Sequence, residues 1–429
     1  MLFTSAQATK YTFDLAQRQA EVERKEDARK KLDFYYDEQL SYLYDRLAEH
    51  FSDPERFSLV SLNIVQKIID GLSTVYIQPA SRRVQGNSQD QNIFDRIAEQ
   101  ADLDIRMKQA NRLSKLCGTV LIKPVFRQGQ IALDLLTPDI LDVETGSSPQ
   151  DVQAVTIAYY PESGKQEELT YTRWTKDSIE RLDYNKNLVS SQSNPYQTLP
   201  FVPIWSSLPV AEFWQTTGNS LIAAQEALNE KLTDLIYILR LQGFSVPSIT
   251  GAGQEVGQLD PGSALNLPQD AEFDFKAPNS PIRETLDSID YLVKTVAISY
   301  GLPASYLSNK PSERKSGISR LIENKELSEK RADDILLFSK YEKELFQKIK
   351  TIWNWHSQSK ISADSELEIN FADPQQASIS EQAQSWALLM DYSVLSPVDV
   401  IQKMNPSMTE EEAIQKFQQN QNYSTPTQA

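Results

Sequence analysis

Apolar residues along the chain change their spacing twice, and these changes divide it into helical and β-rich regions. Before residue 119 they recur every three or four positions, which is the period of an amphipathic helix. This pattern predicts helices over about 13–50, 54–71 and, in two pieces, 91–117, with a short strand at 73–77. From Thr119 to about Val210 β-branched and aromatic residues alternate with polar ones, which predicts a β-rich region with hairpins at 127–129 and 161–164.

Three long helices follow, separated by polar breaks. The first is predicted over 217–243, and the next segment, 244–280, is rich in Gly and Pro. The second spans 281–302 and closes at Gly301 with Pro303 just beyond, as helices commonly end. Its apolar residues lie three and four positions apart: Ile282, Leu286, Ile289, Leu292, Val293, Val296 and Ile298.

The third long helix begins near residue 318, and no Pro or Gly interrupts the chain until Pro374. Its charged segment allows ion pairs one turn apart, such as Glu326 with Lys330. A strand is predicted from Leu367, and shorter helices follow it. The polar composition of 421–429 predicts a disordered tail.

A basic loop separates the second long helix from the third. It carries Asn309, Lys310, Arg314 and Lys315, with Pro311 in its middle. Cations on a loop held between two helices fit contact with a polyanion, whereas the simplest alternative is a solvated surface loop. The chain as a whole has a net charge of −16 and a pI near 4.8, which opposes tight nucleic-acid binding and leaves loose contact through a few local cations.

The sequence offers no visible catalytic or metal site. It lacks a phosphate-binding GxxxxGK[ST] loop, GxGxxG, GxSxG and HExxH. His50 and His356 are isolated in predicted helices, and the single cysteine, Cys117, is expected to be a small buried residue. The acidic residues between 134 and 144 have the spacing of solvated strand-end carboxylates, not of a metal site. No run of about 18 apolar residues predicts a membrane span. We therefore expect no enzyme activity, no metal and no cofactor.

The order of these parts, together with the residues themselves, resembles the portal proteins of tailed bacteriophages. Segment 199–247 (LPFVPIWSSLPVAEFWQTTGNSLIAAQEALNEKLTDLIYILRLQGFSVP) is similar to the family's lead-in and first stem helix, and 287–307 (DSIDYLVKTVAISYGLPASYL) to its second stem helix. Segment 315–345, which opens KSGISRLIENKEL, is similar to the start of the long helix after the tunnel loop. Segment 367–413 is similar to the family's ending. The resemblance covers roughly residues 50–415.

The resemblance implies an α+β, mostly helical, portal-type fold that assembles into a ring, typically of twelve subunits, at one capsid vertex. The ring would be the channel for DNA packaging and ejection. Its implied partners are double-stranded DNA, terminase, a head-completion or adaptor protein, and the major capsid and scaffolding proteins, with no membrane contact. The implied divisions are a wing from 1–216, stem helices at 217–243 and 281–302, a clip at 244–280, a tunnel loop at 303–316, a long wing helix and strand at 317–372, and a small crown with a disordered tail at 373–429.

The implied DNA-facing residues are the loop residues Asn309, Lys310, Arg314 and Lys315, with Lys294 on the second stem helix as a further channel candidate. Lys294 fits equally well an outward lysine that snorkels between subunits. Two other classes of function stay open from the sequence. One is a helical adaptor or scaffold that binds proteins and never meets DNA; the other is an enzyme with an unrecognised site in the β-rich region.

Overall fold

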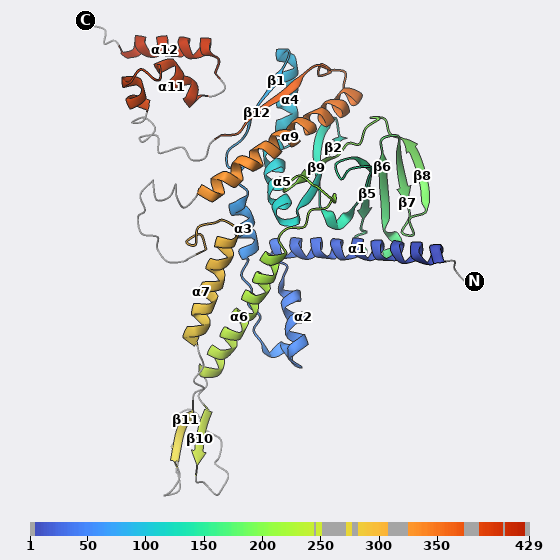
Figure 1. Cartoon of the computed structure of the whole chain (residues 1–429), viewed down its shortest axis with the longest axis vertical. Coiled ribbons are helices and arrows are strands. Elements are labelled where there is room, and N and C mark those ends of the chain that lie inside the picture. Colours follow the sequence, from blue (N-terminus) through green and yellow to red (C-terminus); the bar gives the residue numbers. More distant parts are fainter. Residues whose placement is uncertain are drawn as a thin grey trace.

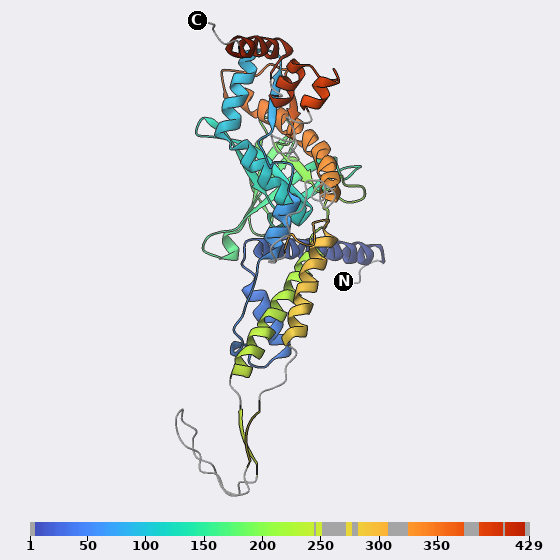
Figure 2. The same ribbon diagram turned by 90° about the vertical axis from the view of Figure 1, so that its left-hand side faces the viewer.

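The computed structural model describes residues 5–243, 246–250, 272–276, 282–307, 325–372, 386–405 and 408–424. It is an α+β protein, as predicted. A broad body of helices and sheets, made by 5–35, 64–216 and 325–372, stands above two long helices that project from it (Figures 1 and 2). Residues 40–50 lie beside the first of these helices, and a two-stranded ribbon lies beyond the far end of the pair. No helix in the described part of the chain is long and apolar enough to cross a membrane.

The N-terminal region is more broken than its periodicity predicts. The expected helix over 13–50 is two helices, α1 (Ser5–Tyr35) and α2 (Leu40–His50), because the chain turns at Asp37 with a φ of +67°. The expected helix over 54–71 is a 3-10 turn, η1 (Pro54–Arg56), then extended chain, and then α3 (Ile64–Leu72). Residues 73–77 form no strand. The strand of this region lies later, at β1 (Ser81–Gln85).

Two helices and two antiparallel sheets form most of the body. Helices α4 (Ser88–Gln100) and α5 (Leu103–Cys117) confirm the prediction and end at Gly118. One sheet has the order β3-β2-β9, from β2 (Thr119–Arg127), β3 (Gln130–Leu136) and β9 (Val202–Trp205). The five-stranded sheet has the order β4-β5-β6-β7-β8. Its strands are β4 (Leu141–Thr145), β5 (Val152–Tyr159), β6 (Thr170–Thr175), β7 (Ser178–Leu182) and β8 (Leu188–Ser193). Both predicted hairpins are present, as β2–β3 and β5–β6.

The long helix α9 (Lys325–His356) crosses the body and carries much of its core. Phe338, Tyr341, Leu345 and Phe346 are at most 1% exposed, and α9 contacts both β2 and β9. The predicted strand after it is β12 (Glu366–Asn370), whose partner β1 was not anticipated. The predicted ion pair between Glu326 and Lys330 is present at 2.9 Å.

The projecting helices are α6 (Asn219–Gly243) and α7 (Ile282–Ser299), which we call the stem. In α7 only Val296 and Ala297 are buried, while Leu286 and Ile298 are 49% and 58% exposed, so the expected apolar face is only partly covered by α6. Strands β10 (Val246–Thr250) and β11 (Glu272–Lys276) lie in the Gly/Pro-rich segment and pair to form the ribbon. At the C-terminal end, residues 386–391, α11 (Pro397–Met404) and α12 (Glu410–Ser424) are helical. Residues 421–424 therefore belong to a helix, not to the disordered tail that we expected.

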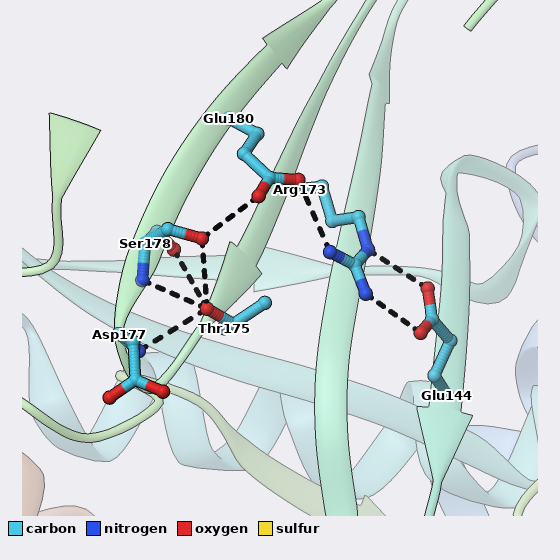
Figure 3. Close-up of polar contacts among 6 residues, drawn as sticks. All are labelled: Glu144, Arg173, Thr175, Asp177, Ser178 and Glu180. Atoms are coloured by element: carbon cyan, nitrogen blue, oxygen red, sulfur yellow. Dashed lines mark hydrogen bonds and ion pairs between the residues drawn. The ribbon is translucent and has the colours of Figure 1, made fainter. Parts of the chain in front are cut away.

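Charged side chains link three strands of the five-stranded sheet, β4, β6 and β7, on one face (Figure 3). Arg173 on β6 donates two hydrogen bonds to Glu144 on β4, at 2.9 and 2.8 Å, and one to Glu180 on β7 at 3.1 Å. To reach Glu144 it crosses β5, where the small residues Ala154 and Thr156 leave room. The hydrogen bonds from Arg173 lower the pKa of Glu144. At the end of the β6–β7 hairpin, the Thr175 hydroxyl accepts the backbone N–H groups of Asp177 and Ser178 (Figure 3).

A buried lysine lies where the two sheets meet. Lys123 on β2 is 7% exposed, and its Nζ lies 4.2 Å from the ring centre of Trp174 and 5.6 Å from that of Phe201. Within the described residues no carboxylate pairs directly with it. Burial lowers the pKa of Lys123 to about 8. In the unfolded chain this lysine keeps its proton up to about pH 10. Below pH 8 the folded protein must bury the charged form, which lowers its stability; this cost disappears as the pH rises from about 8 to about 10.

We expect Lys123→Met to raise the free energy of unfolding by about 2 kcal/mol at pH 7, because methionine keeps an apolar side chain of similar length and removes the buried charge. The gain should shrink towards zero at pH 10. Urea unfolding of the purified protein at both pH values measures it, with the exposed Lys165→Met as the matched control. A variant that is less stable than the wild type at pH 7 would show that contact with the aromatic rings outweighs burial.

Candidate functional site at the junction of stem and body

A row of polar side chains bonds the first stem helix to the body. Gln225, Asn229 and Thr233 lie one turn apart on α6 and are at most 1% exposed. They accept the backbone N–H groups of Ile64, Leu62 and Val60 at 2.9, 3.3 and 3.2 Å. Four helical residues rise about 6.0 Å and two extended residues about 6.6 Å, so successive turns of α6 meet alternate residues of the extended segment. This polar row is why 57–63 is not helical.

The row continues into the bend between α1 and α2. Asn229 donates to the buried Gln39 side chain at 2.9 Å, and Gln39 donates to Asp37 at 3.1 Å. On the same helix Glu226 pairs with Lys30 at 2.7 Å and with Arg46 at 3.3 Å. Arg46 also pairs with Glu230. The direction of the stem is therefore fixed against both N-terminal helices.

The end of the second stem helix is held by the long body helix. Gly301 adopts a φ of +75° and the Leu302 N–H returns to the Ala297 carbonyl at 2.9 Å, which closes α7. Lys330 of α9 donates to the Tyr300 carbonyl at 2.9 Å, where a cation also suits the negative end of the helix dipole. A Cβ at Gly301 would lie 2.5 Å from both Glu326 Oε1 and Lys330 Nζ. The two helices that flank the basic loop are thus joined directly, and Gly301 permits the close approach.

Tyr306 anchors the chain after α7 onto α3. Its hydroxyl donates to the Lys67 carbonyl at 3.1 Å, and its ring packs over Gly71, where a Cβ would lie 2.5 Å from the hydroxyl oxygen. Burial raises the pKa of Tyr306. This anchor and the contacts of Lys330 set the positions from which the basic loop departs and to which it returns.

The sequence-predicted site residues have different outcomes. Asn309, Lys310, Arg314 and Lys315 lie outside the described residues, so their role stays a prediction. Lys294 lies on α7 with its side chain about one-third exposed and pairs with Asp290 one turn earlier. This ion pair offsets the charge of Lys294, and its role in a channel stays a prediction.

Three of the four acidic residues between 134 and 144, Asp134, Asp142 and Glu144, form ion pairs, and Asp139 accepts a hydrogen bond from the Thr137 hydroxyl. Asp134 pairs with Arg127 at 2.7 Å, and Asp142 pairs with Lys25 at 2.8 Å. Within the described ranges no group of three or more His, Cys, Asp or Glu side chains could hold a metal. Cys117 is buried as predicted, and burial raises the pKa of its thiol to about 12. His356 stacks on Phe126 with ring centres 4.4 Å apart.

Sequence reasoning missed Gln225, Asn229, Thr233 and Tyr306. The first three had a visible signal: polar residues at a spacing of four on an otherwise apolar helix face indicate a buried polar contact. Tyr306 had none, because its role depends on the distant Gly71.

No protein-family model matches the sequence, and no curated protein matches it either. The solved structures with similar chains include three assemblies of one kind of particle. A chain of the virion of the native gene transfer agent (GTA) particle is 14% identical, over 77% of this chain and 84% of that one, with a TM-score of 0.44. A chain from the neck of the empty GTA particle, computed with C6 symmetry, is 14% identical over 80% and 89%, with a TM-score of 0.48. A chain from the neck of the native GTA particle, computed with C12 symmetry, is 15% identical over 77% and 85%, with a TM-score of 0.46. At these scores the likeness does not decide function.

We expect Gly71→Ala to lower the free energy of unfolding by about 1 kcal/mol, because the new methyl group displaces Tyr306. In a Tyr306→Ala background the same change should stabilise the protein by about 0.5–1 kcal/mol, because Ala is the better helix former. Denaturant unfolding of the four proteins gives both values. The same sign in both backgrounds would contradict the anchor.

Proposed function

We propose that this chain is a portal-type subunit, and that copies of it form a ring around a passage for duplex DNA at one vertex of a phage-like particle. The observation that carries the proposal is the stem. Two long antiparallel helices project from a broad body and continue into a β-ribbon at one end, and at the other end the second of them leads into the basic loop. This is the order of parts that the sequence resemblance implies.

The charges of the stem suit a passage through which DNA moves. Helices α6 and α7 carry six acidic and four basic side chains, so their surface has no net attraction for phosphate. Each phosphate that a protein neutralises adds salt-dependent affinity. Attraction would therefore be confined to the loop cations, Lys310, Arg314 and Lys315, which would guide DNA without holding it.

A ring of this kind uses a heterologous contact, in which two different faces of the subunit meet and close by rotation. The proposed ring has twelve copies. In the proposed assembly the β-ribbon end, or clip, meets terminase during packaging and a head-completion or adaptor protein afterwards. The body, or wing, faces the capsid and scaffolding proteins. The chain itself catalyses no reaction.

A helical adaptor or scaffold without DNA contact is the second candidate, because a projecting helical pair also suits protein docking. Negative-stain electron microscopy of the purified chain separates the two. We expect closed rings with a central hole about 20 Å wide or more, because the hole must be wide enough for a DNA duplex to pass. A stable monomer or dimer at micromolar concentration would contradict the portal proposal.

We expect the triple variant Lys310→Ala, Arg314→Ala, Lys315→Ala to assemble into rings as the wild type does, because in the sequence these residues belong to the segment between α7 and α9 and to neither helix. Packaged DNA per particle should fall at least about tenfold, since loss of three cations per subunit removes the guiding contact. The matched control replaces three exposed body lysines, Lys165, Lys343 and Lys360, with Ala. Normal genome content in the loop variant would contradict the role of these cations.

A further inference from the structure

Strand β8, at the end of the five-stranded sheet, has no core to pack against. Every one of its residues is exposed, and the adjacent Leu188 and Val189, whose side chains point to opposite faces, are 62% and 68% exposed. Backbone pairing with β7 alone holds β8 in place. On its other side no described strand pairs with it.

The hydrogen-bond register identifies which groups face outward. The Asn194 N–H bonds the Asp177 carbonyl at 2.9 Å, and Ser193 and Ser191 lie opposite Ser178 and Glu180. Because antiparallel pairs alternate between bonded and non-bonded, Gln192 and Ser190 turn their N–H and C=O groups towards β7. Ser191 and Ser193 therefore direct theirs away from the sheet, into the open edge.

This edge lacks the features that usually protect an exposed strand. Natural edges carry charged residues, Pro or a bulge that turns the strand away. From Asn187 to Asn194 the chain has no charged residue and no Pro. The only irregularity lies at its start, opposite Arg181 and Leu182. The strands behind it are firmly held by the contacts of Arg173 with Glu144 and Glu180, so the edge is a rigid template (Figure 3).

Its position decides the kind of partner. The strands of the sheet succeed one another away from the stem, and β8 is the one farthest from α6 and α7 (Figure 1). Copies in a ring whose axis runs along the stem would pack most closely through the shortest dimension of the chain, which is the viewing direction of Figure 1, and the open edge would then point outward. This step rests on the proposed function. The occupant is then a segment of a different protein that surrounds the ring.

We propose that β8 binds an extended segment of that surrounding protein by β-strand addition. Main-chain hydrogen bonds to Ser191 and Ser193 would supply the affinity. Opposite 190–193 the partner strand would carry hydroxyl or amide side chains, which can hydrogen-bond the Ser and Gln side chains of β8 across the strand pair. Opposite Leu188 and Val189 it would carry apolar ones. Repetition around the ring would add avidity to a weak single contact.

Hydrogen exchange tests the proposal on intact rings and on purified particles that contain them. The fragment covering 188–193 should exchange about 100-fold more slowly in the particle than in the free ring. Equal exchange in both would overturn strand addition while leaving the ring intact. Protection already present in the free ring would mean that β8 pairs with another copy, which also overturns the assignment. Failure to form rings at all would instead refute the proposed function.

The variant Ser191→Pro removes one outward N–H and leaves the bonds of β8 to β7 in place, as an edge strand permits. We expect it to form rings and to enter particles at least about tenfold less often, which is the worth of one hydrogen bond repeated at several sites. Ser191→Ala, which keeps the N–H, is the matched control and should enter particles normally. Normal incorporation of Ser191→Pro would overturn the proposal even if the fragment is protected.

Discussion

The polar row on α6 is the interaction on which the shape of the molecule depends. A helix that leaves a protein body has few apolar neighbours to hold it, and apolar contact alone does not fix a direction. Besides the buried apolar side chains of α6, Gln225, Asn229 and Thr233 supply directional bonds to three backbone N–H groups. Because these side chains are buried, losing one partner leaves an unpaired polar group, which costs about 1–3 kcal/mol. The row therefore selects one orientation of the stem.

The second stem helix, α7, is oriented by its contacts with α6 and with the body. Ser220 on α6 and Tyr300 at the end of α7 are within hydrogen-bond distance, with their hydroxyl oxygens 2.9 Å apart. From Tyr300 the restraint passes to α9 through Lys330, whose side chain bonds the Tyr300 carbonyl. A chain of bonds thus joins α3, α6, α7 and α9 around the place where the basic loop begins and ends. The proposed contact of this loop with a moving polyanion would need fixed ends, and this arrangement provides them.

Periodicity predicted the elements whose partners are apolar. Helices α5 and α9 were predictable because their apolar spacing matches a buried face, and so was hairpin β2–β3, where Gln128 and Gly129 both adopt positive φ. The helix expected over 54–71 was a wrong prediction in its first half, because the partners of that segment are polar and not apolar. Leu59 and Leu62 have helical spacing, but the backbone N–H groups there bond to α6, and Leu62 is 53% exposed. The competing partner lies more than 160 residues away, where no local pattern reveals it.

Strand β8 was missed because it has no alternation to detect: a strand exposed on both faces needs no apolar side. The same lack of a buried face suggests that β8 has a role other than packing in the folded molecule. Selection for packing explains the residues of β5, of which Ala154, Val155 and Ile157 are at most 1% exposed, but it cannot explain a regular strand that buries nothing. A strand held only by its backbone presents its other backbone edge in a fixed register. The stem and β8 therefore show one principle at two sites: where the chain has no core to pack into, its backbone and amide groups determine what it contacts.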